Sequence, residues 1–106
     1  MTVNIPAVSQ QPLDGRALER LAELFHALGD PSRLHILSLL LAGETNVGAL
    51  AEQVGISEPG VSFHLRLLRQ LNIVRARRQG REIYYRLDDD HVTEVLTRGW
   101  EHVTHA

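Results

Sequence analysis

The sequence predicts a mainly α-helical domain that carries a small β-hairpin, and three observations support this fold class. Apolar residues recur at helical spacing in five segments, and two short alternating segments flank Gln79 and Gly80. The 106 residues, 43% hydrophobic and 23% charged, are typical of one soluble globular domain. Since the sequence contains no cysteine, disulfides, thiolate metal sites and cysteine nucleophiles are excluded.

The N-terminal part divides into a tail and a first helix. Residues 1–11 are polar, contain a proline and show no period, so we expect a flexible tail followed by one domain over residues 12–106. A helical stripe of apolar residues begins at Pro12, and Gly29 ends it. The chain shows neither a secretory signal nor an apolar stretch that could span a bilayer, so we expect a cytoplasmic protein.

Three further helices are predicted from their N-cap residues. Asp30 caps a second helix that has Pro31 in its first turn. This helix is apolar on nearly all sides, which predicts a central, buried position. Thr45 or Asn46 caps a third helix, and Ser57 caps a fourth.

The third and fourth helices have the spacing of a helix-turn-helix. Ala51 is the small residue where two such helices cross, and Gly55 tolerates the positive φ that the turn needs. The residues expected to hold this pair to the core are Leu50, Val54, Ile56, Val61 and Leu65. The hairpin of residues 73–78 and 81–87, with its tip at Gln79-Gly80, would be the wing of a winged helix-turn-helix. A last helix begins in the aspartate run at residues 88–90.

Positive charge is concentrated in one part of the chain. The net charge is −2, yet residues 63–87 hold seven arginines and one glutamate, and the residues on both sides are acidic. The arginines are Arg66, Arg69, Arg75, Arg77, Arg78, Arg81 and Arg86. Such a block favours phosphate binding over a strand pair with scattered solvated charge, so double-stranded DNA is the expected partner.

The fourth helix would place its N-terminal turns in the major groove, while the wing follows the DNA backbone. Ser57 can be either a DNA contact or only a cap, and Glu58 would repel phosphate but could accept from a cytosine amine. Phe63 lies on this side but is expected to pack. The candidate DNA-binding residues are Ser57, Glu58, Gly60, Ser62, Phe63, His64, Arg66, Arg77, Arg78 and Arg81. A DNA-binding winged helix therefore explains the sequence better than an enzyme or a purely protein-binding winged helix.

Four potential metal ligands, Asp89, His91, His102 and His105, lie on the last helix. The three histidines share one face, and Asp89 joins them only if it lies where the helix begins. Because His91 and His102 are about 16 Å apart along the axis, one helix cannot close a site. An antiparallel second copy would bring the first pair of one chain to the second pair of the other, giving two sites per dimer. Three imidazoles and a carboxylate suit tetrahedral Zn(II), with Co(II) as a substitute, and surface histidines without metal are the alternative.

Three motifs resemble the ArsR/SmtB family of winged-helix metalloregulators: FHALGDPSRLHIL at 25–37, ISEPGVSFHLRLL at 56–68 and ARRQGREIYYRL at 76–87. The last helix, DDHVTEVLTRGWEHVTH, is similar to the zinc-sensing branch, in which a D-x-H pair and an H-x2-H pair from two subunits bind metal. The resemblance implies a homodimer with paired N- and C-terminal helices whose metal-free form represses by binding operator DNA. Zn(II), as the allosteric inducer, would weaken that binding and derepress metal efflux or homeostasis genes.

Other functions remain open on the same residues. A Ni(II) or Co(II) sensor of the same architecture would use the four ligands and add donors to reach six-coordination. A winged-helix repressor that does not respond to metal would leave the histidines incidental. A small metallohydrolase is disfavoured because four protein ligands leave no open position for water. No membrane or small-molecule substrate is expected as a partner.

Overall fold

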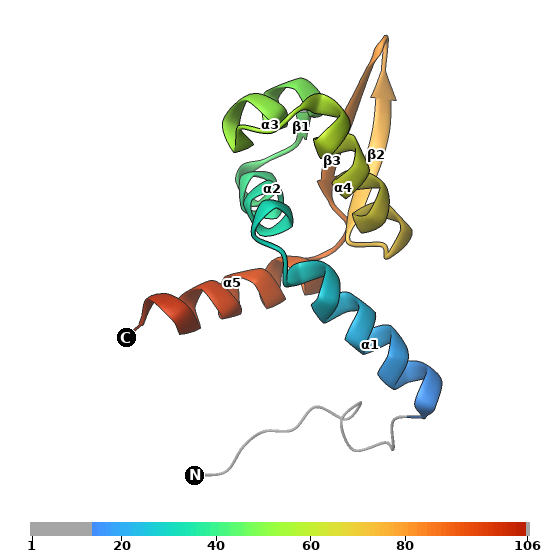
Figure 1. Cartoon of the computed structure of the whole chain (residues 1–106), viewed down its shortest axis with the longest axis vertical. Coiled ribbons are helices and arrows are strands. Elements are labelled where there is room, and N and C mark those ends of the chain that lie inside the picture. The colour runs from blue at the N-terminus through green and yellow to red at the C-terminus, as the bar shows by residue number, and fades with distance from the viewer. Residues whose placement is uncertain (1–13, 106) are drawn as a thin grey trace.

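The computed structural model describes residues 14–105, and within them the chain forms five helices and three strands (Figure 1). The elements are α1 (Gly15–Leu28), α2 (Pro31–Ala42), β1 (Thr45–Asn46), α3 (Val47–Val54), α4 (Glu58–Gln70), β2 (Val74–Gln79), β3 (Glu82–Leu87) and α5 (Asp90–Thr104). The predicted tail and the expected helix start at Pro12 lie outside the described residues. The order confirms the predicted four helices, hairpin and final helix, and adds the short strand β1.

Each helix begins at a polar residue whose side chain accepts a hydrogen bond from a backbone N–H three positions further on. These N-caps are Asp14, Asp30, Asn46, Ser57 and Asp89. Each satisfies an N–H that would otherwise lack an intrahelical partner. The caps of α2 to α5 therefore fall where the sequence predicts them, and of the two candidates for α3 the cap is Asn46.

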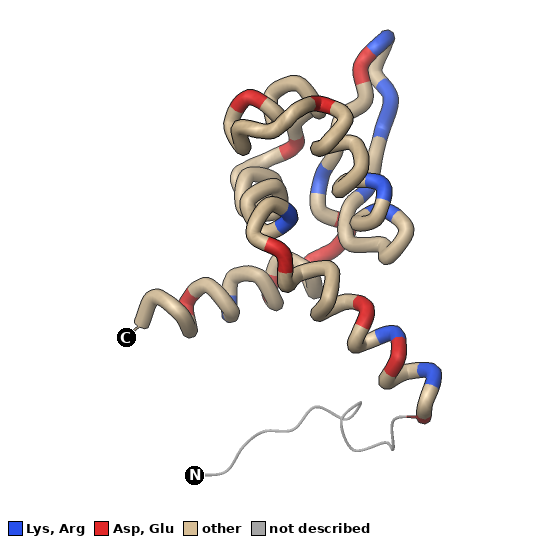
Figure 2. The backbone as a smooth tube through the Cα atoms, viewed as in Figure 1, with Lys and Arg blue, Asp and Glu red and all other residues tan. Residues whose placement is uncertain are grey.

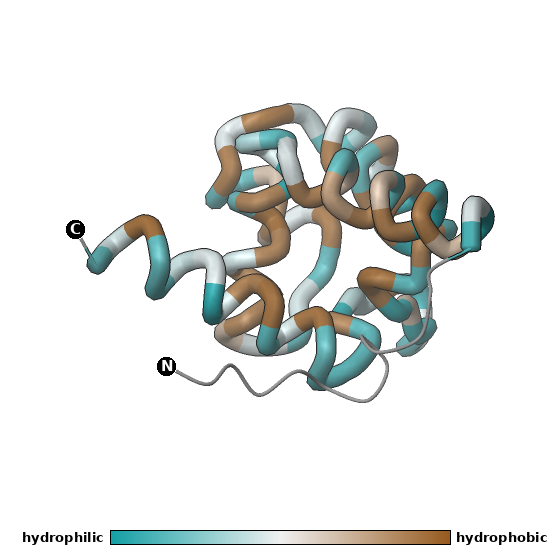
Figure 3. Tube along the Cα trace, turned by 90° about the horizontal axis from the view of Figure 1, so that it is seen from below, coloured by the Kyte–Doolittle hydropathy of each residue, from teal (hydrophilic) through white to brown (hydrophobic). Residues whose placement is uncertain are grey.

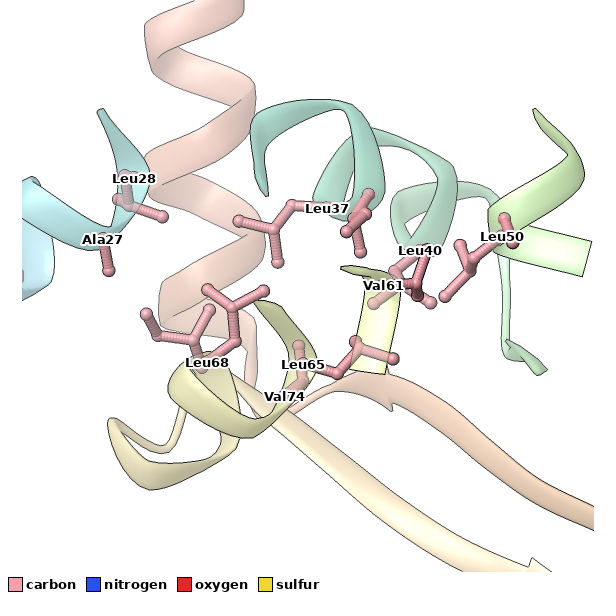
Figure 4. Close-up of a cluster of buried hydrophobic side chains, with 12 residues drawn as sticks. Ala27, Leu28, Leu37, Leu40, Leu50, Val61, Leu65, Leu68 and Val74 are labelled. Carbon is pink, nitrogen blue, oxygen red and sulfur yellow. The ribbon is translucent and has the colours of Figure 1, made fainter. Parts of the chain in front are cut away.

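The core lies between α2, α3, α4 and the base of the hairpin (Figure 4). Ile36 and Leu37 of α2 and Leu65 of α4 are completely buried. The other core residues are Ala27, Leu28, Leu40, Leu50, Ala51, Val61, Leu68, Ile73 and Val74. α2 is central, as predicted, but it is buried on one side only: Leu34 and Leu41 are 42% and 39% exposed. These two side chains line an apolar groove between α2 and α5, which this chain leaves open.

The three strands form an antiparallel sheet in the order β1-β3-β2. In the hairpin, Val74 pairs with Leu87 and Gln79 pairs with Glu82, so the turn consists of Gly80 and Arg81. The predicted tip at Gln79-Gly80 is therefore one residue early, because the cross-strand register sets the turn. Gly80 has φ +64°, a conformation that glycine adopts without a steric cost.

The hairpin tip and the two terminal helices lie at opposite ends of the molecule (Figure 1). α1 and α5 diverge from the body at one end, and apolar residues recur along both helices when the molecule is seen from that end (Figure 3). Within the described part of the chain, no helix is both long enough and apolar enough to span a membrane.

Candidate nucleic-acid interface and metal centre

The turn between α3 and α4 has the geometry that the sequence predicts for a helix-turn-helix. Gly55 follows α3 in the left-handed conformation at φ +81°, and Ala51 is buried on α3. Val61 and Leu65 anchor one side of α4 in the core. The other side of α4 is left exposed beside the hairpin (Figure 1).

The first turn of α4 combines a cap with a close backbone approach. The Oγ of Ser57 accepts a hydrogen bond from the N–H of Gly60 at 3.1 Å, so the capping role of Ser57 is present in the structure. A Cβ on residue 60 would lie 3.2 Å from that Oγ, so the glycine leaves room for the cap. Glu58 is exposed in the first turn, where the helix dipole stabilises a carboxylate, and Ser62 is half-buried one turn later.

Two aromatic rings follow on α4. Phe63 is 61% exposed, so the expectation that it packs within the chain is wrong. The buried stripe of α4 passes through Val61, Leu65 and Leu68, and position 63 lies off that stripe. The rings of Phe63 and His64 lie edge to face, with their centroids 5.8 Å apart. His64 is half-buried, and its Nδ1 is enclosed without a hydrogen-bond partner among the described residues.

Arginines on α4 and the hairpin gather in one region of the backbone (Figure 2). Arg66 and Arg69 are exposed on α4, and Arg78 and Arg81 are exposed near the hairpin tip. Arg78 donates from Nε to the carbonyl of Gly80 at 3.2 Å. Within residues 14–105 none of these four arginines forms an ion pair, so their charge is available to an external anion. Arg69 is not among the predicted DNA-binding residues, although its position three residues after Arg66 on one helix could have indicated it.

Two arginines of β2, Arg75 and Arg77, are engaged within the chain. Arg75 pairs with Asp88, with Nε 2.7 Å from Oδ1. Arg77, a predicted DNA contact, donates from Nε to both carboxylate oxygens of Glu44, at 2.8 and 2.9 Å, and from Nη2 to one of them. The hydrogen bonds and charge of Arg77 hold the pKa of the Glu44 carboxyl below its usual range. Arg77 therefore differs from Arg78 and Arg81 at the tip, because its charge is paired with a carboxylate of the same chain.

Asp89 lies at the start of α5, which is the condition under which it could act together with His91. Its Oδ1 accepts from the N–H of Val92 at 3.0 Å, and its Oδ2 lies 3.5 Å from Nδ1 of His91. The hydrogen bond from Val92 and the neighbouring His91 hold the pKa of the Asp89 carboxyl below its usual range. The ionised carboxylate and the exposed imidazole form an O,N donor pair of the kind that divalent transition metals accept.

His102 and His105 lie at the other end of α5. Both are exposed, and they line an open hollow of about 320 Å³ with Arg98 and Glu101. In the described part of the chain, no three His, Asp or Glu side chains are placed to hold a metal ion. The structure therefore brings each predicted pair together but keeps the two pairs apart, as the length of the helix requires.

α1 and α5 each expose an apolar face. α5 contributes no buried residue in this chain, although it is 15 residues long. The exposed apolar residues on these two helices are Leu18, Leu21, Phe25, Val95, Trp100 and Val103. Apolar faces of this extent on two neighbouring helices are typical of a protein–protein contact.

Over most of its length the chain is similar to known regulatory proteins. The family described as bacterial regulatory protein, arsR family, matches residues 30–76. The chain is 43% identical over 94 residues to the HTH-type transcriptional regulator NmtR of Mycobacterium tuberculosis, covering 89% of this chain and 78% of that protein. It is 37% identical over 94 residues to the cadmium resistance transcriptional regulatory protein CadC homolog of Staphylococcus aureus, covering 88% of this chain and 73% of that protein.

The fold is similar to that of a homodimeric winged helix-turn-helix DNA-binding domain from Mycobacterium bovis, described as a possible ArsR-family transcriptional regulator. The two structures agree with a TM-score of 0.79 and 32% sequence identity, covering 92% of this chain and 94% of that one. The predicted winged helix-turn-helix is therefore confirmed, with α3 and α4 as the helix-turn-helix and β2 and β3 as the wing.

Proposed function

We propose that this chain, which belongs to the arsR family of bacterial regulatory proteins, is a homodimeric repressor that binds operator DNA and releases it when Zn(II) binds. The observation that carries the metal response is the layout of α5. Asp89 and His91 meet at its start, within 3.5 Å, while His102 and His105 share a hollow near its end.

Because the family consists of transcriptional regulators, the expectation that the chain is not an enzyme is confirmed.

DNA binding is supported by the surface of α4 and the wing. The exposed side of α4 would enter the major groove, where Glu58, Ser62 and Phe63 are near enough to the helix N-terminus to approach base edges. Arg66 on α4 and Arg78 and Arg81 on the wing, which form no ion pair within residues 14–105, would contact phosphates. Two copies related by a two-fold axis would read two half-sites.

Dimerisation and metal binding would involve the same helix. The exposed apolar faces of α1 and α5 would pack against a second copy, so that the α5 helices pair in antiparallel orientation. Asp89 and His91 of one chain, with His102 and His105 of the other, would then hold the ion. This donor set of three imidazoles and one carboxylate fits Zn(II) and is one that Co(II) also accepts. When bound, the ion would supply a cross-link between subunits that favours one relative orientation of the two recognition helices.

A cobalt titration combined with DNA binding tests the proposal. We expect an intense tetrahedral Co(II) spectrum that saturates at about one ion per subunit, is displaced by Zn(II) and disappears in His102→Ala. In the same samples, Zn(II) should release the protein from a labelled duplex that carries the promoter of its own gene. Zn(II) should not release the His102→Ala, His105→Ala double variant from this duplex. His26→Ala, which removes an exposed histidine outside α5, is the matched control.

The other outcomes of this experiment separate the alternatives. A weak six-coordinate spectrum would replace Zn(II) with Ni(II) or Co(II) as the inducer. Normal duplex binding with no bound cobalt would leave a repressor that does not respond to metal. By linkage, DNA must weaken metal binding by the same factor by which metal weakens DNA binding, so a one-sided effect would reject the allosteric coupling.

A further inference from the structure

The base of the wing is attached to the segment between α2 and α3 by side chains. Arg77 uses all three guanidinium nitrogens within the chain: Nε and Nη2 donate to Glu44, and Nη1 donates to Gln79 at 2.7 Å. The guanidinium carbon also lies 5.1 Å from the centre of the Tyr84 ring, directly across the hairpin. Bidentate carboxylate pairing and stacking on an aromatic ring both fix the orientation of a guanidinium.

Glu44 is well placed to restrain the hairpin because β1 follows it immediately. β1 pairs with β3 through only two residues, with Thr45 opposite Tyr85 and Asn46 opposite Tyr84. A two-residue strand restrains the direction of a projecting hairpin weakly, so side-chain contacts add to the attachment that β1 and the buried Val74 provide. Besides the Glu44–Arg77 pair, the Nδ2 of Asn46 donates to Glu82 at 2.8 Å.

We propose that Glu44 and Arg77 form a clamp that sets the direction of the wing and keeps the charge of Arg77 away from DNA phosphates. The inference rests on the proposed DNA binding and makes Arg77 a positioning residue, while Arg78 and Arg81 at the tip contact DNA. The Glu44 carboxylate occupies the Nε and Nη2 edge of the guanidinium and neutralises its charge, so a phosphate would have to displace Glu44 to bind that edge in the same bidentate way. The pairing also raises the pKa of Arg77 and lowers that of Glu44, as expected for two charges held in contact.

The salt dependence of DNA binding distinguishes a clamped arginine from one that contacts phosphate. The probe is a fluorescent mixed-sequence duplex of about 30 base pairs, because each phosphate contact contributes about 0.9 to the slope of log K against log salt. Glu44→Gln releases Arg77 and should steepen the slope by about 0.9 for each wing on the duplex, whereas Arg77→Gln should leave it unchanged. The Glu44→Gln, Arg77→Gln double variant should return to the wild-type slope.

A matched control separates release of an arginine from loss of a negative charge. Glu82→Gln removes one negative charge, as Glu44→Gln does, from the hairpin itself and keeps an acceptor for Asn46, but in the described residues Glu82 holds no arginine. Its slope should equal that of the wild type. Equal steepening of the salt slope in Glu82→Gln and Glu44→Gln would show a general charge effect. It would overturn the inference that Glu44 keeps Arg77 away from DNA phosphates.

The positioning role is measured without DNA. Hydrogen exchange of the β2 and β3 amides should lose protection in both Glu44→Gln and Arg77→Gln and keep it in Glu82→Gln. A salt slope that falls by about 0.9 per wing in Arg77→Gln while the β2 and β3 amides keep their protection would show a direct phosphate contact and overturn the clamp. Unchanged exchange in both clamp variants would overturn it as well, whereas a lower slope together with lost protection is the result of a misdirected wing. If the wild-type chain binds no duplex, the proposed DNA binding fails, and the exchange measurement still decides whether the wing is held in this way.

Discussion

Two variants that each fail to bind metal should regain binding when they are mixed, if each site takes its ligands from both subunits. The first variant carries Asp89→Asn and His91→Ala, and the second carries His102→Ala and His105→Ala. Asparagine is chosen at 89 because Asp89 caps α5, and an amide oxygen can still accept the hydrogen bond from Val92. Neither variant can complete a site within one chain, since the two ligand pairs lie about 16 Å apart along the helix.

The expected capacity follows from counting ligands. Every homodimer of either variant lacks half of both sites. In a mixed dimer one site gathers all four intact ligands, and the other site has none. Random exchange makes half of the dimers mixed, so the mixture should bind about 0.25 ion per subunit, against about 1 for the unaltered protein.

The assay is the Co(II) absorption of each variant before and after the two are equilibrated together. A tag on one variant allows mixed dimers to be isolated, and these should bind about one ion per dimer. Isolated mixed dimers that bind no cobalt would refute the shared site. Binding by either variant alone would show that a single chain supplies enough ligands.

Further predictions concern the DNA surface, the dimer, the core and pH. Arg81→Gln should reduce the salt slope of duplex binding by about 0.9 per wing, and an unchanged slope would remove Arg81 from the interface. Trp100 is 68% exposed on the free face of α5, so Trp100→Arg should raise the dimer dissociation constant by about tenfold or more in sedimentation experiments without changing the circular dichroism of the monomer. Leu65→Ala should cost about 2–5 kcal/mol in urea unfolding, against about 0.5 kcal/mol or less for the exposed control Arg69→Ala. The pKa of Asp89 is lowered in the folded protein, so its contribution to stability is complete above its ordinary pKa and is lost as pH falls through the lowered one. Melting temperatures below about pH 4 should therefore depend less on pH in Asp89→Asn than in the wild type.

Local features of the fold were predictable because they depend on residues near one another in the chain. Asp30, Ser57 and Asp89 cap helices through residues three positions away, and Gly55 turns the chain within one residue. β1 was missed because two residues show no period. The hairpin tip was misplaced by one residue because the pairing of the two strands sets the turn, and both neighbours of Gly80 are compatible with a turn.

The candidate site was predictable as a set of residues but not in how those residues are used. Charge clustering identified the arginine block, and spacing predicts two candidate metal-ligand pairs on α5. The sequence could not distinguish Arg77 from Arg78, since the two are adjacent and identical in kind. The exposure of Phe63 was also unexpected, because an aromatic residue in a helix is more often buried.

The sequence by itself determined the helices, their caps and the helix-turn-helix spacing, since each depends on interactions within about one or two helical turns. It also placed four potential metal ligands on one helix. Only the tertiary structure decided that Arg77 forms an ion pair with Glu44 and that Arg78 and Arg81 form none within the described residues. It also decided that α1 and α5 keep their apolar faces exposed. Glu44 and Arg77 are 33 residues apart and meet only when β1 pairs with the hairpin. Their contact is therefore a property of the folded chain, whereas the distance between the two candidate ligand pairs on α5 follows from helix geometry alone.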